Sequence, residues 1–321
     1  MGRDIVVIGG SAGAFEPLQQ VVSEFPARMP AAVFVVLHLP ATSRSSLAAI
    51  LNRTGSMQAV VPRDGDPVRP GFVYVPTPDH HLEVHDHTIK ITRGPKINGV
   101  RPAVDVLFRS AAACCGPRVV GVVLSGGLDD GSAGLAAICA AGGIGIVQDP
   151  ADAVVPWMPR NALETAGADH VLTADRIGSM ILHTIHDPEP AGRKITSNGG
   201  LEMKAVGVGD TPGQVTGITC PECHGSIWMQ KGEGGQVAFT CRVGHSYSPE
   251  SFFDIQAENV ENALWAGVRS LEEQSSLADV MADRSLRMDD GDAQRRYEER
   301  SRVARDNAEV LRKLILERSE A

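Results

Sequence analysis

The first 186 residues alternate short apolar runs with segments of helical pattern, and this alternation constrains the fold more than any other feature. The apolar runs predict strands near 4–8, 33–37, 72–75, 119–124, 144–147 and 169–172. The segments between and after them predict helices near 14–24, 43–53, 102–114, 132–140, 157–166 and 175–186. Strands that alternate with helices form a parallel sheet with helices on its faces. The sequence therefore predicts a doubly wound α/β domain with a mostly parallel sheet.

The segment 81–91 has a different pattern, with apolar and polar residues alternating on both sides of a short polar turn. This predicts an antiparallel hairpin, inserted in the sheet or at its edge. Alternation places His81, His85 and His87 on one face of a regular strand. We interpret these histidines as a solvated rim rather than as a metal site.

Beyond residue 186 the alternation stops and three further parts follow. Residues 187–215 are rich in proline, glycine and polar residues, which is typical of a linker. A cysteine-bearing module is expected at 216–248, and a helical tail at 249–321. In the tail, apolar residues recur at steps of three and four, which predicts two amphipathic helices paired as a hairpin. Their apolar stripe is suited to self-association or to docking of a partner.

Composition excludes several classes of protein. The formal net charge of −9 argues against nucleic acid or an anionic membrane as the main partner. No apolar run is long enough to cross a bilayer, and the first residues show no signal-peptide pattern. Six cysteines in 321 residues do not form a disulfide scaffold, so we expect reduced thiols or metal ligands. These features together predict a cytoplasmic protein without membrane insertion.

The turn Gly9-Gly10-Ser11-Ala12-Gly13 directly follows the first apolar strand. Its glycines allow a sharp turn that exposes a serine hydroxyl at the sheet edge and leaves backbone N–H groups free to hold an oxyanion. The alternatives are a nucleotide-binding turn or a capping serine. A dinucleotide fingerprint beginning at Gly9 would need glycine at position 11, where serine stands.

Two further polar residues lie near strand ends. His38 ends the run 33–37, and Asp130 lies six residues beyond Leu124 in a glycine-dense loop. A core histidine and a helix-capping aspartate are the alternatives, and Asp129 competes with Asp130 for either role. The C-terminal edge of a parallel sheet is where α/β proteins hold their reactive groups. Ser11, His38 and Asp130 are therefore predicted to form a nucleophile–base–orienter relay.

Residues 3–185 resemble the catalytic domain of the CheB-type protein-glutamate methylesterases of bacterial chemotaxis. The motifs that carry the resemblance are Ile8–Gly13, Leu37–Pro40, Gly71–Pro76, Arg101–Phe108, Gly121–Gly134 and Met158–Arg160. The resemblance implies Ser11 as nucleophile, His38 as base and Asp130 as orienter. It also implies hydrolysis of glutamate methyl esters on chemoreceptor helices, with release of methanol and without a cofactor for catalysis. Many members of the family also deamidate receptor glutamines.

The resemblance has three departures. The family often has threonine where Ala12 stands and methionine where Gly127 stands. The first strand starts at residue 4, so we expect the chain to lack the phosphorylation-controlled receiver domain that normally precedes this one. Arg101 begins a motif that fits either a plain helix start or a supporting contact with catalytic residues or substrate. Support of the oxyanion or substrate is expected from Ala12, Gly13, Gly126, Gly127, Arg101 and Met158.

The module at 216–248 carries two chelating pairs. Cys220-Pro-Glu-Cys223 is followed after seventeen residues by Cys241, with His245 four positions further on. This spacing predicts a structural zinc site with no open coordination position, of the zinc-ribbon type. A reduced pair of thiols without metal is the alternative, and His224 is a geometrically awkward substitute ligand. A similar element accompanies some stand-alone methylesterase-like proteins.

We therefore expect a serine esterase that acts on glutamyl methyl esters of a protein. Two alternatives come from other classes. A non-catalytic signalling scaffold would use the esterase fold and the zinc–helix region as docking surfaces. A small-molecule carboxylesterase would use the same three side chains on another substrate.

Overall fold

The computed structural model describes residues 2–38, 47–85, 87–186, 213–231 and 237–319. The chain divides into two compact units, Met1–Phe252 and Phe253–Ala321. Three expectations fall wholly or mainly outside the described residues. They are the Leu39-Pro40 end of a motif, the start of the predicted helix 43–53, and most of the predicted linker 187–215.

The first unit contains a seven-stranded sheet with the order β3-β4-β2-β1-β7-β8-β9. All of its strand pairs are parallel. The strands are β1 (Ile5–Gly10), β2 (Ala32–Leu37), β3 (Gln58–Val60), β4 (Phe72–Tyr74), β7 (Val119–Val123), β8 (Ile144–Gln148) and β9 (His170–Leu172). The predicted α/β fold with a mostly parallel sheet is confirmed, and β3 is a strand that the apolar pattern did not predict.

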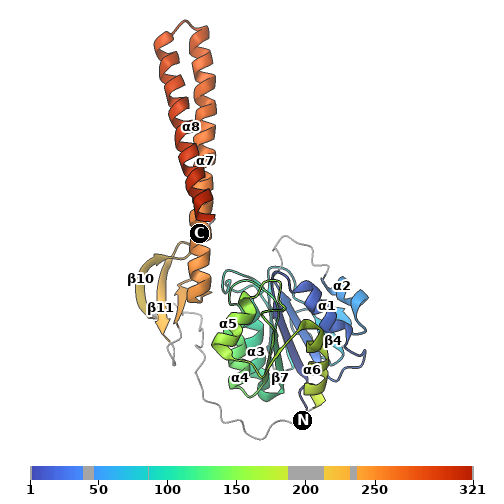
Figure 1. The fold of residues 1–321 in the computed structure, drawn as a ribbon. Helices are drawn as coiled ribbons and strands as arrows, with labels where there is room; N and C mark the ends of the chain where they lie inside the picture. The colour runs from blue at the N-terminus through green and yellow to red at the C-terminus, as the bar shows by residue number, and fades with distance from the viewer. Residues whose placement is uncertain (1, 39–46, 86, 187–212, 232–236, 320–321) are drawn as a thin grey trace. The chain divides into compact units, whose positions relative to one another are not determined.

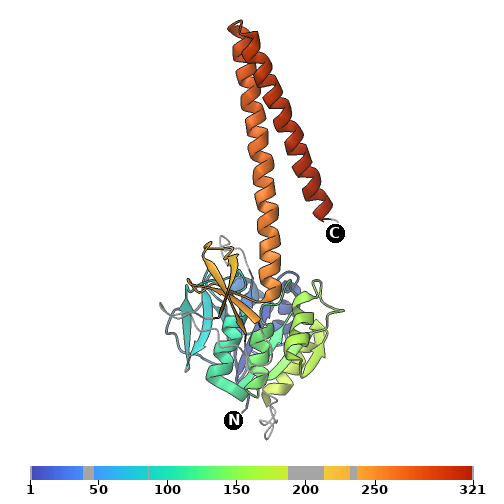
Figure 2. The same ribbon diagram turned by 90° about the vertical axis from the view of Figure 1, so that its left-hand side faces the viewer.

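Helices cover both faces of this sheet (Figure 1). One layer contains α1 (Phe15–Ser23), α2 (Leu47–Thr54) and α6 (Ala174–His186). The other contains α3 (Val104–Cys115), α4 (Ser132–Ala140) and α5 (Trp157–Ala166), and Figure 2 turns this layer toward the viewer. Most crossovers between the parallel strands pass through one of these helices, since parallel neighbours cannot be joined by a tight turn. The parallel neighbours β3 and β4 are joined without a helix, and α6 follows the last strand.

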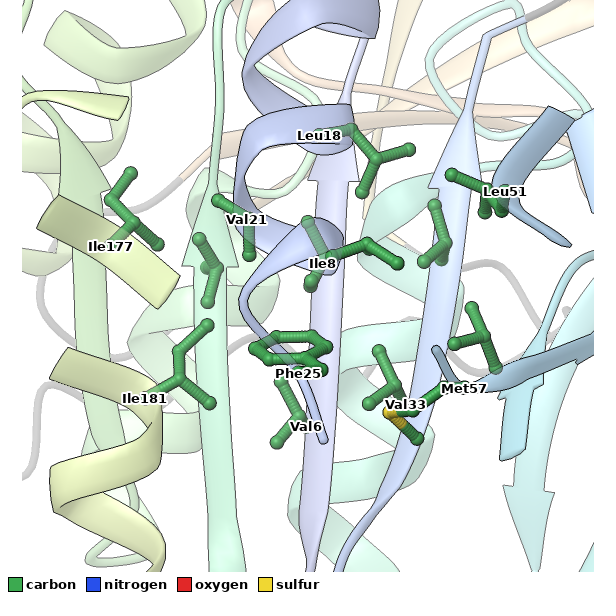
Figure 3. Packing of buried hydrophobic residues seen from close by; sticks show 14 of the residues in the cluster. Val6, Ile8, Leu18, Val21, Phe25, Val33, Leu51, Met57, Ile177 and Ile181 are labelled. Carbon is green, nitrogen blue, oxygen red and sulfur yellow. The ribbon is translucent and has the colours of Figure 1, made fainter. Parts of the chain in front are cut away.

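The sheet is buried on both faces because successive side chains of a strand point to opposite sides. In β1, Val6 and Ile8 pack into the core under α1, α2 and α6, as Figure 3 shows. Ile5 and Val7 of the same strand pack into the core under α3, α4 and α5. All six residues of β1 are buried. Such burial accounts for the uninterrupted apolar runs of the sequence and makes the strand ends rigid supports for side chains.

The antiparallel hairpin exists, but its predicted position was wrong. β5 (His81–His85) and β6 (Thr88–Thr92) form a separate two-stranded sheet, neither inserted in the large one nor paired to its edge. The reason is its apolar face, because Leu82, Val84 and Ile89 are buried in the core that contains α3. Burial against a helix therefore takes the place of backbone pairing to the sheet edge.

A second, four-stranded antiparallel sheet follows in the same unit. Its strands are β10 (Gln214–Thr219), β11 (Ser226–Lys231), β12 (Val237–Cys241) and β13 (Ser246–Tyr247). Two long helices, α7 (Pro249–Arg287) and α8 (Gly291–Ser319), end the chain. They run antiparallel, since Ser275 bonds Ser301 while the earlier Glu272 pairs with the later Arg312. No helix in the described part of the chain has the length and apolar character to cross a membrane.

Candidate active site

Three segments meet at the C-terminal edge of the large sheet. Ser11 directly follows β1 and His38 directly follows β2, and the residues before them, Gly10 and Leu37, are paired across the two strands. The His38 N–H donates to the Gly10 carbonyl at 3.2 Å, and the Ser11 N–H donates to the Ser125 carbonyl beyond β7 at 2.9 Å. Neighbouring strands lie about 4.8 Å apart. The fold therefore brings Ser11 and His38 side by side, as the reasoning from strand ends predicted.

The turn at Ser11 is crowded, which accounts for its glycines. Gly13 has a φ of +75°, and a Cβ there would lie 2.7 Å from both Ser125 Oγ and Val154 Cβ. A Cβ at Gly126 would lie 2.0 Å from Met158 Sδ and 3.0 Å from Ser11 Cβ. The predicted support residues Gly126 and Met158 thus pack beside Ser11, and only glycine allows so close an approach.

His38 and Asp130 are joined by a short hydrogen bond. The distance from His38 Nε2 to Asp130 Oδ2 is 2.8 Å. The Asp130 side chain is only 3% exposed, while that of His38 is 16% exposed and reaches the surface of the site. Because an ionised carboxylate only accepts, Nε2 carries the proton and Nδ1 is the ring atom that can accept one. In the described part of the chain, no hydrogen bond joins Ser11 Oγ to His38 in this resting geometry.

Asp130 is held as an ionised carboxylate. Burial would raise its pKa, but the His38 hydrogen bond and the backbone N–H groups of Val104 and Asp105 outweigh burial and hold the pKa below its ordinary value. The N–H groups of Val104 and Asp105 donate at 2.6 and 3.1 Å and belong to the first turn of α3. A helix N-terminus stabilises negative charge through such groups. Asp130 therefore remains a negatively charged acceptor for His38.

The neighbouring acids have other partners. Asp129 accepts a hydrogen bond from Ser251 Oγ at 2.5 Å, and burial raises its pKa. Asp105 accepts from the N–H groups of Gly131 and Gly134, and burial raises its pKa to about 7. Of the two candidate aspartates of the loop, Asp130 is the one hydrogen-bonded to His38.

The candidate oxyanion donors do not all have a free N–H. The Gly126 N–H already donates to the Val155 carbonyl at 2.9 Å, so it is not a free donor in this structure. The N–H groups of Ala12, Gly13 and Gly127 make no hydrogen bond to any described residue. These three N–H groups lie in the turn after β1 and the loop after β7, which flank Ser11, and they are the available donors.

The guanidinium of Arg101 is hydrogen-bonded within the protein, to Asp79 and to the Gly94 carbonyl. Its guanidinium bonds Asp79 Oδ1 through Nε at 2.9 Å and Nη2 at 2.7 Å, and Nη1 donates to the Gly94 carbonyl. Hydrogen bonds from Arg101, and then from Arg93, hold the pKa of Asp79 below its ordinary value. Of the two readings of Arg101, these contacts fit the plain structural one, because their partners, Asp79 and Gly94, are not among the candidate catalytic residues.

The comparisons with known proteins agree with this geometry. A model of the family described as CheB methylesterase matches residues 6–181, more than half of the chain. The chain belongs to the CheB methylesterase family. The match includes all the strands of the large sheet except the first residue of β1, and it includes Ser11, His38 and Asp130.

Relatives and one solved structure cover the same region. A "Protein-glutamate methylesterase/protein-glutamine glutaminase 2" of Pseudomonas aeruginosa is 38% identical over 182 residues, 56% of this chain and 52% of that protein. A "Putative protein-glutamate methylesterase/protein-glutamine glutaminase" of Leptospira interrogans is 31% identical over 57% of this chain and 95% of that protein. The Thermotoga maritima CheB methylesterase catalytic domain matches with a TM-score of 0.54 and 34% identity, over 57% of this chain and 99% of that one.

A "Protein-glutamate methylesterase/protein-glutamine glutaminase 1" of Xanthomonas euvesicatoria is 40% identical over 56% of this chain and 51% of that protein. The chain thus spans about half the length of the first curated relatives that it matches. The CheB methylesterase family match ends at residue 181, before the second sheet.

The four predicted ligands of the second sheet converge. The ligand atoms of Cys220, Cys223, Cys241 and His245 all lie within 4.8 Å of one another. Cys223 Sγ lies 3.6 Å from Cys241 Sγ, and His245 Nδ1 lies 3.5 Å from Cys241 Sγ and 3.6 Å from Cys220 Sγ. His224 is exposed and lies outside this group. In the described residues this is the sole cluster with metal-binding geometry. The interpretation of the hairpin histidines as a solvated rim is wrong for His81, which is 3% exposed and lies 3.0 Å from the Pro95 carbonyl through Nε2.

Asn98 was not predicted as a functional residue, although it is buried and lies beside Asp130 in the candidate active site. Its Nδ2 is 3.4 Å from Asp105 Oδ2 and 3.4 Å from Asp130 Oδ1. The available signal was the dipeptide Asn98-Gly99, a strong marker of a turn, directly before the Arg101 motif. That signal indicates backbone conformation, but it carries no information about a side chain aimed at two carboxylates.

Proposed function

We propose that this chain is a serine hydrolase that removes methyl esters from glutamate side chains of methyl-accepting, chemoreceptor-like proteins. The observation that carries the proposal is the 2.8 Å hydrogen bond between His38 Nε2 and buried Asp130. His38 follows β2, the strand paired with the one that Ser11 follows. A proton held on Nε2 leaves Nδ1 to act as a base at the sheet edge. The names of the family's relatives support methyl esters of protein glutamate as the substrate.

In the first half of the reaction, Ser11 Oγ attacks the ester carbonyl and its proton passes to His38 Nδ1. Asp130 stabilises the imidazolium that forms. The N–H groups of Ala12, Gly13 and Gly127 would donate to the oxyanion, because they have no other partner among the described residues. Collapse of the intermediate breaks the bond to the methoxy group, which takes the proton from His38 and leaves as methanol.

In the second half, a water molecule attacks the glutamyl ester of Ser11 while His38 takes its proton. The carboxylate of glutamate is released and the serine is restored. The same steps on a glutamine side chain would release ammonia in place of methanol. The family relatives are named for both activities, so we propose deamidation as a second activity of the same site. No step needs a cofactor.

Methanol release from a methylated chemoreceptor protein tests the proposal. The full chain should release methanol, and Ser11→Ala should not. Ser23→Ala is the matched control, since this exposed serine bonds only the Gln20 carbonyl of its own helix. Equal release by wild type and Ser11→Ala would contradict the mechanism.

Two other classes of function would give different results. A non-catalytic scaffold would bind the receptor protein without any release of methanol by wild type. A small-molecule carboxylesterase would hydrolyse a chromogenic acetate ester in a Ser11-dependent way and leave the receptor methylated. The buried, ionised Asp130 favours a catalyst over a scaffold. Burial of a charged carboxylate costs folding free energy, and a docking surface would not need such a carboxylate paired with His38.

We also propose a structural Zn²⁺ held by Cys220, Cys223, Cys241 and His245. With Zn–S bonds of about 2.3 Å, neighbouring ligand atoms of a tetrahedron lie about 3.8 Å apart. The ligand distances of 3.5 and 3.6 Å fit this requirement. Four protein ligands leave no open position, so the metal would stabilise the second sheet and take no part in ester hydrolysis. The sheet would then be a zinc-ribbon-like module.

The proposed parts are the catalytic domain at 1–186, the linker at 187–215, the zinc module at 216–248 and the helical tail at 249–321. In the tail, α7 and α8 would form a hairpin whose exposed apolar side chains dock a second copy or a partner helix. Leu277 and Val310 are each 64% exposed, which leaves apolar surface to cover. Sedimentation of the full chain alone distinguishes self-association from docking of a partner.

A further inference from the structure

Asn98 lies in a tight turn between the β5–β6 hairpin and α3. Ile97 and Val100 form a bridge across it, and Asn98 has a φ of +51° with only 6% of its surface exposed. Asparagine tolerates this left-handed conformation better than most residues. The turn by itself therefore accounts for an asparagine or glycine at position 98, but not for the direction of a buried amide.

The segment Ser246–Ser248 determines the direction of that amide. The Asn98 N–H donates to the Ser246 carbonyl at 2.8 Å, and the Ser248 N–H donates to Asn98 Oδ1 at 3.1 Å. With its oxygen engaged by Ser248, the amide must turn its NH₂ group toward the carboxylates of Asp105 and Asp130. One amide thus connects the second sheet with the aspartate that holds His38.

A second contact reaches the same loop from the start of α7. Ser251 Oγ donates to Asp129 Oδ1 at 2.5 Å, and the Ser251 N–H donates to Ser248 Oγ at 3.0 Å. Ser251 is fully buried in this arrangement. The adjacent residues Asp129 and Asp130 are therefore both contacted by groups that depend on residues 246–251.

These contacts matter because the three acids are crowded, with Asp105 and Asp130 buried and Asp129 half-buried. Repulsion among carboxylates in a low-dielectric site is relieved by hydrogen-bond donors placed between them. If residues 246–251 moved away, the Asn98 amide could rotate and present its oxygen to Asp105 and Asp130. The carboxylate of Asp130 would then lose a donor on Oδ1, and its position relative to His38 would be less well defined.

We propose that Asn98 is a positioning residue for the His38–Asp130 pair, and that residues 246–251 hold it in place, so that full esterase turnover requires the second sheet. This inference rests on the proposed esterase function. It gives the end of the second sheet and the start of α7 a role in the esterase reaction. Residues 246–251 act through Asn98 and Asp129, and no hydrogen bond from these six residues reaches Ser11 or His38 in the described part of the chain.

The variant Asn98→Gly separates the two roles of the residue. Glycine keeps the left-handed turn but removes the amide. We expect kcat for methanol release by the full chain to fall about tenfold, as for loss of one hydrogen bond to a charged group, with KM within about twofold. The proton of the His38–Asp130 hydrogen bond should also shift or broaden in the far-downfield NMR spectrum.

Ser251→Ala tests the contact from the other side, and Ser276→Ala is its matched control in the same helix. Ser276 is exposed and bonds only the Glu272 carbonyl. We expect Ser251→Ala to lower kcat and to perturb the same proton resonance, while Ser276→Ala changes neither. If Asn98→Gly fails to fold, Ser251→Ala decides the question alone.

The inference is overturned if both variants keep kcat within about twofold of wild type and leave the resonance unchanged. A fall in thermal stability without a change in kcat or in the resonance also overturns it, because that pattern describes a merely structural contact. If wild type releases no methanol, the proposed esterase function fails. The resonance then still reports whether Asn98 positions the His38–Asp130 pair.

Discussion

Replacing Asp130 with asparagine tests how the buried carboxylate serves His38. Oδ2 of Asp130 accepts from His38 Nε2 at 2.8 Å and from the Val104 N–H at 2.6 Å. Oδ1 accepts from the Asp105 N–H at 3.1 Å and faces the Asn98 amide at 3.4 Å. Each carboxylate oxygen faces two hydrogen-bond donors. In Asp130→Asn one of these oxygens becomes an NH₂ group, so in either orientation of the amide two donors face this NH₂ group.

Both orientations have a cost that the geometry defines. With the NH₂ group toward His38, Nε2 must become an acceptor and the ring proton moves to Nδ1, which can then no longer take the serine proton. The same loss of tautomer in a comparable triad lowers kcat about 10⁴-fold. With the NH₂ group toward Asp105, buried donors face each other at a cost of about 1–3 kcal/mol. We therefore expect kcat to fall about 10³–10⁴-fold and the free energy of unfolding to fall by about 1–3 kcal/mol.

Single-turnover release of methanol from a methylated receptor protein, together with urea unfolding, measures both quantities. Asp169→Asn, at an aspartate that accepts from the Gly145 N–H away from the site, controls for the loss of a loop carboxylate. Retention of kcat within about tenfold by a folded Asp130→Asn protein would refute the reasoning, because Asp130 would then not determine the tautomer of His38.

Three further predictions concern packing, protonation and metal. In Gly126→Ala the new Cβ would lie 2.0 Å from the Met158 sulfur and 3.0 Å from the Ser11 Cβ, so we expect a lower kcat and a fall of about 1–3 kcal/mol in the free energy of unfolding. In Gly127→Ala the new Cβ meets nothing within 4 Å and should not destabilise the fold. Urea unfolding and methanol release check both variants. Burial raises the pKa of Asp105 to about 7, so the folded chain keeps a proton that the unfolded chain loses near pH 4. The free energy of unfolding of wild type should therefore fall as the pH rises from about 4 to about 7. A pH series of urea unfolding should show a shallower fall for Asp105→Asn, and an equal slope would contradict the assignment. The full chain should bind about one Zn²⁺, Cys220→Ser should lose it and exposed Cys114→Ser should keep it, as metal analysis of the purified proteins will show.

The strand ends of the large sheet could be predicted because periodicity and burial are local in the sequence. A buried parallel strand is a continuous apolar run, and the polar residue that follows it must lie at the sheet edge. This reasoning predicted Ser11 next to His38, and the pairing of Gly10 with Leu37 confirms that the two segments are neighbours. Strand β3 could not be predicted in this way, because Gln58–Val60 has an exposed, a buried and a half-buried residue and so no apolar run.

The contacts between distant segments could not be predicted in this way. The position of the β5–β6 hairpin depends on which helix covers its apolar face, and the alternation of 81–91 does not identify that helix. The Gly126 N–H donates to the carbonyl of Val155, which lies 29 residues further along the chain, so the Gly126-Gly127 sequence alone does not show whether that N–H is free. Asn98 depends on Ser248, which is 150 residues away in the sequence.

In the proposed mechanism Ser11 is the nucleophile and His38 activates it. The most direct test is treatment of the full chain with a fluorophosphonate probe, followed by peptide mapping with mass spectrometry. We expect one adduct per chain, on Ser11, with a labelling rate that falls sharply in Asp130→Asn. An adduct on another residue, or methanol release that survives in a chain whose Ser11 is fully modified, would contradict it.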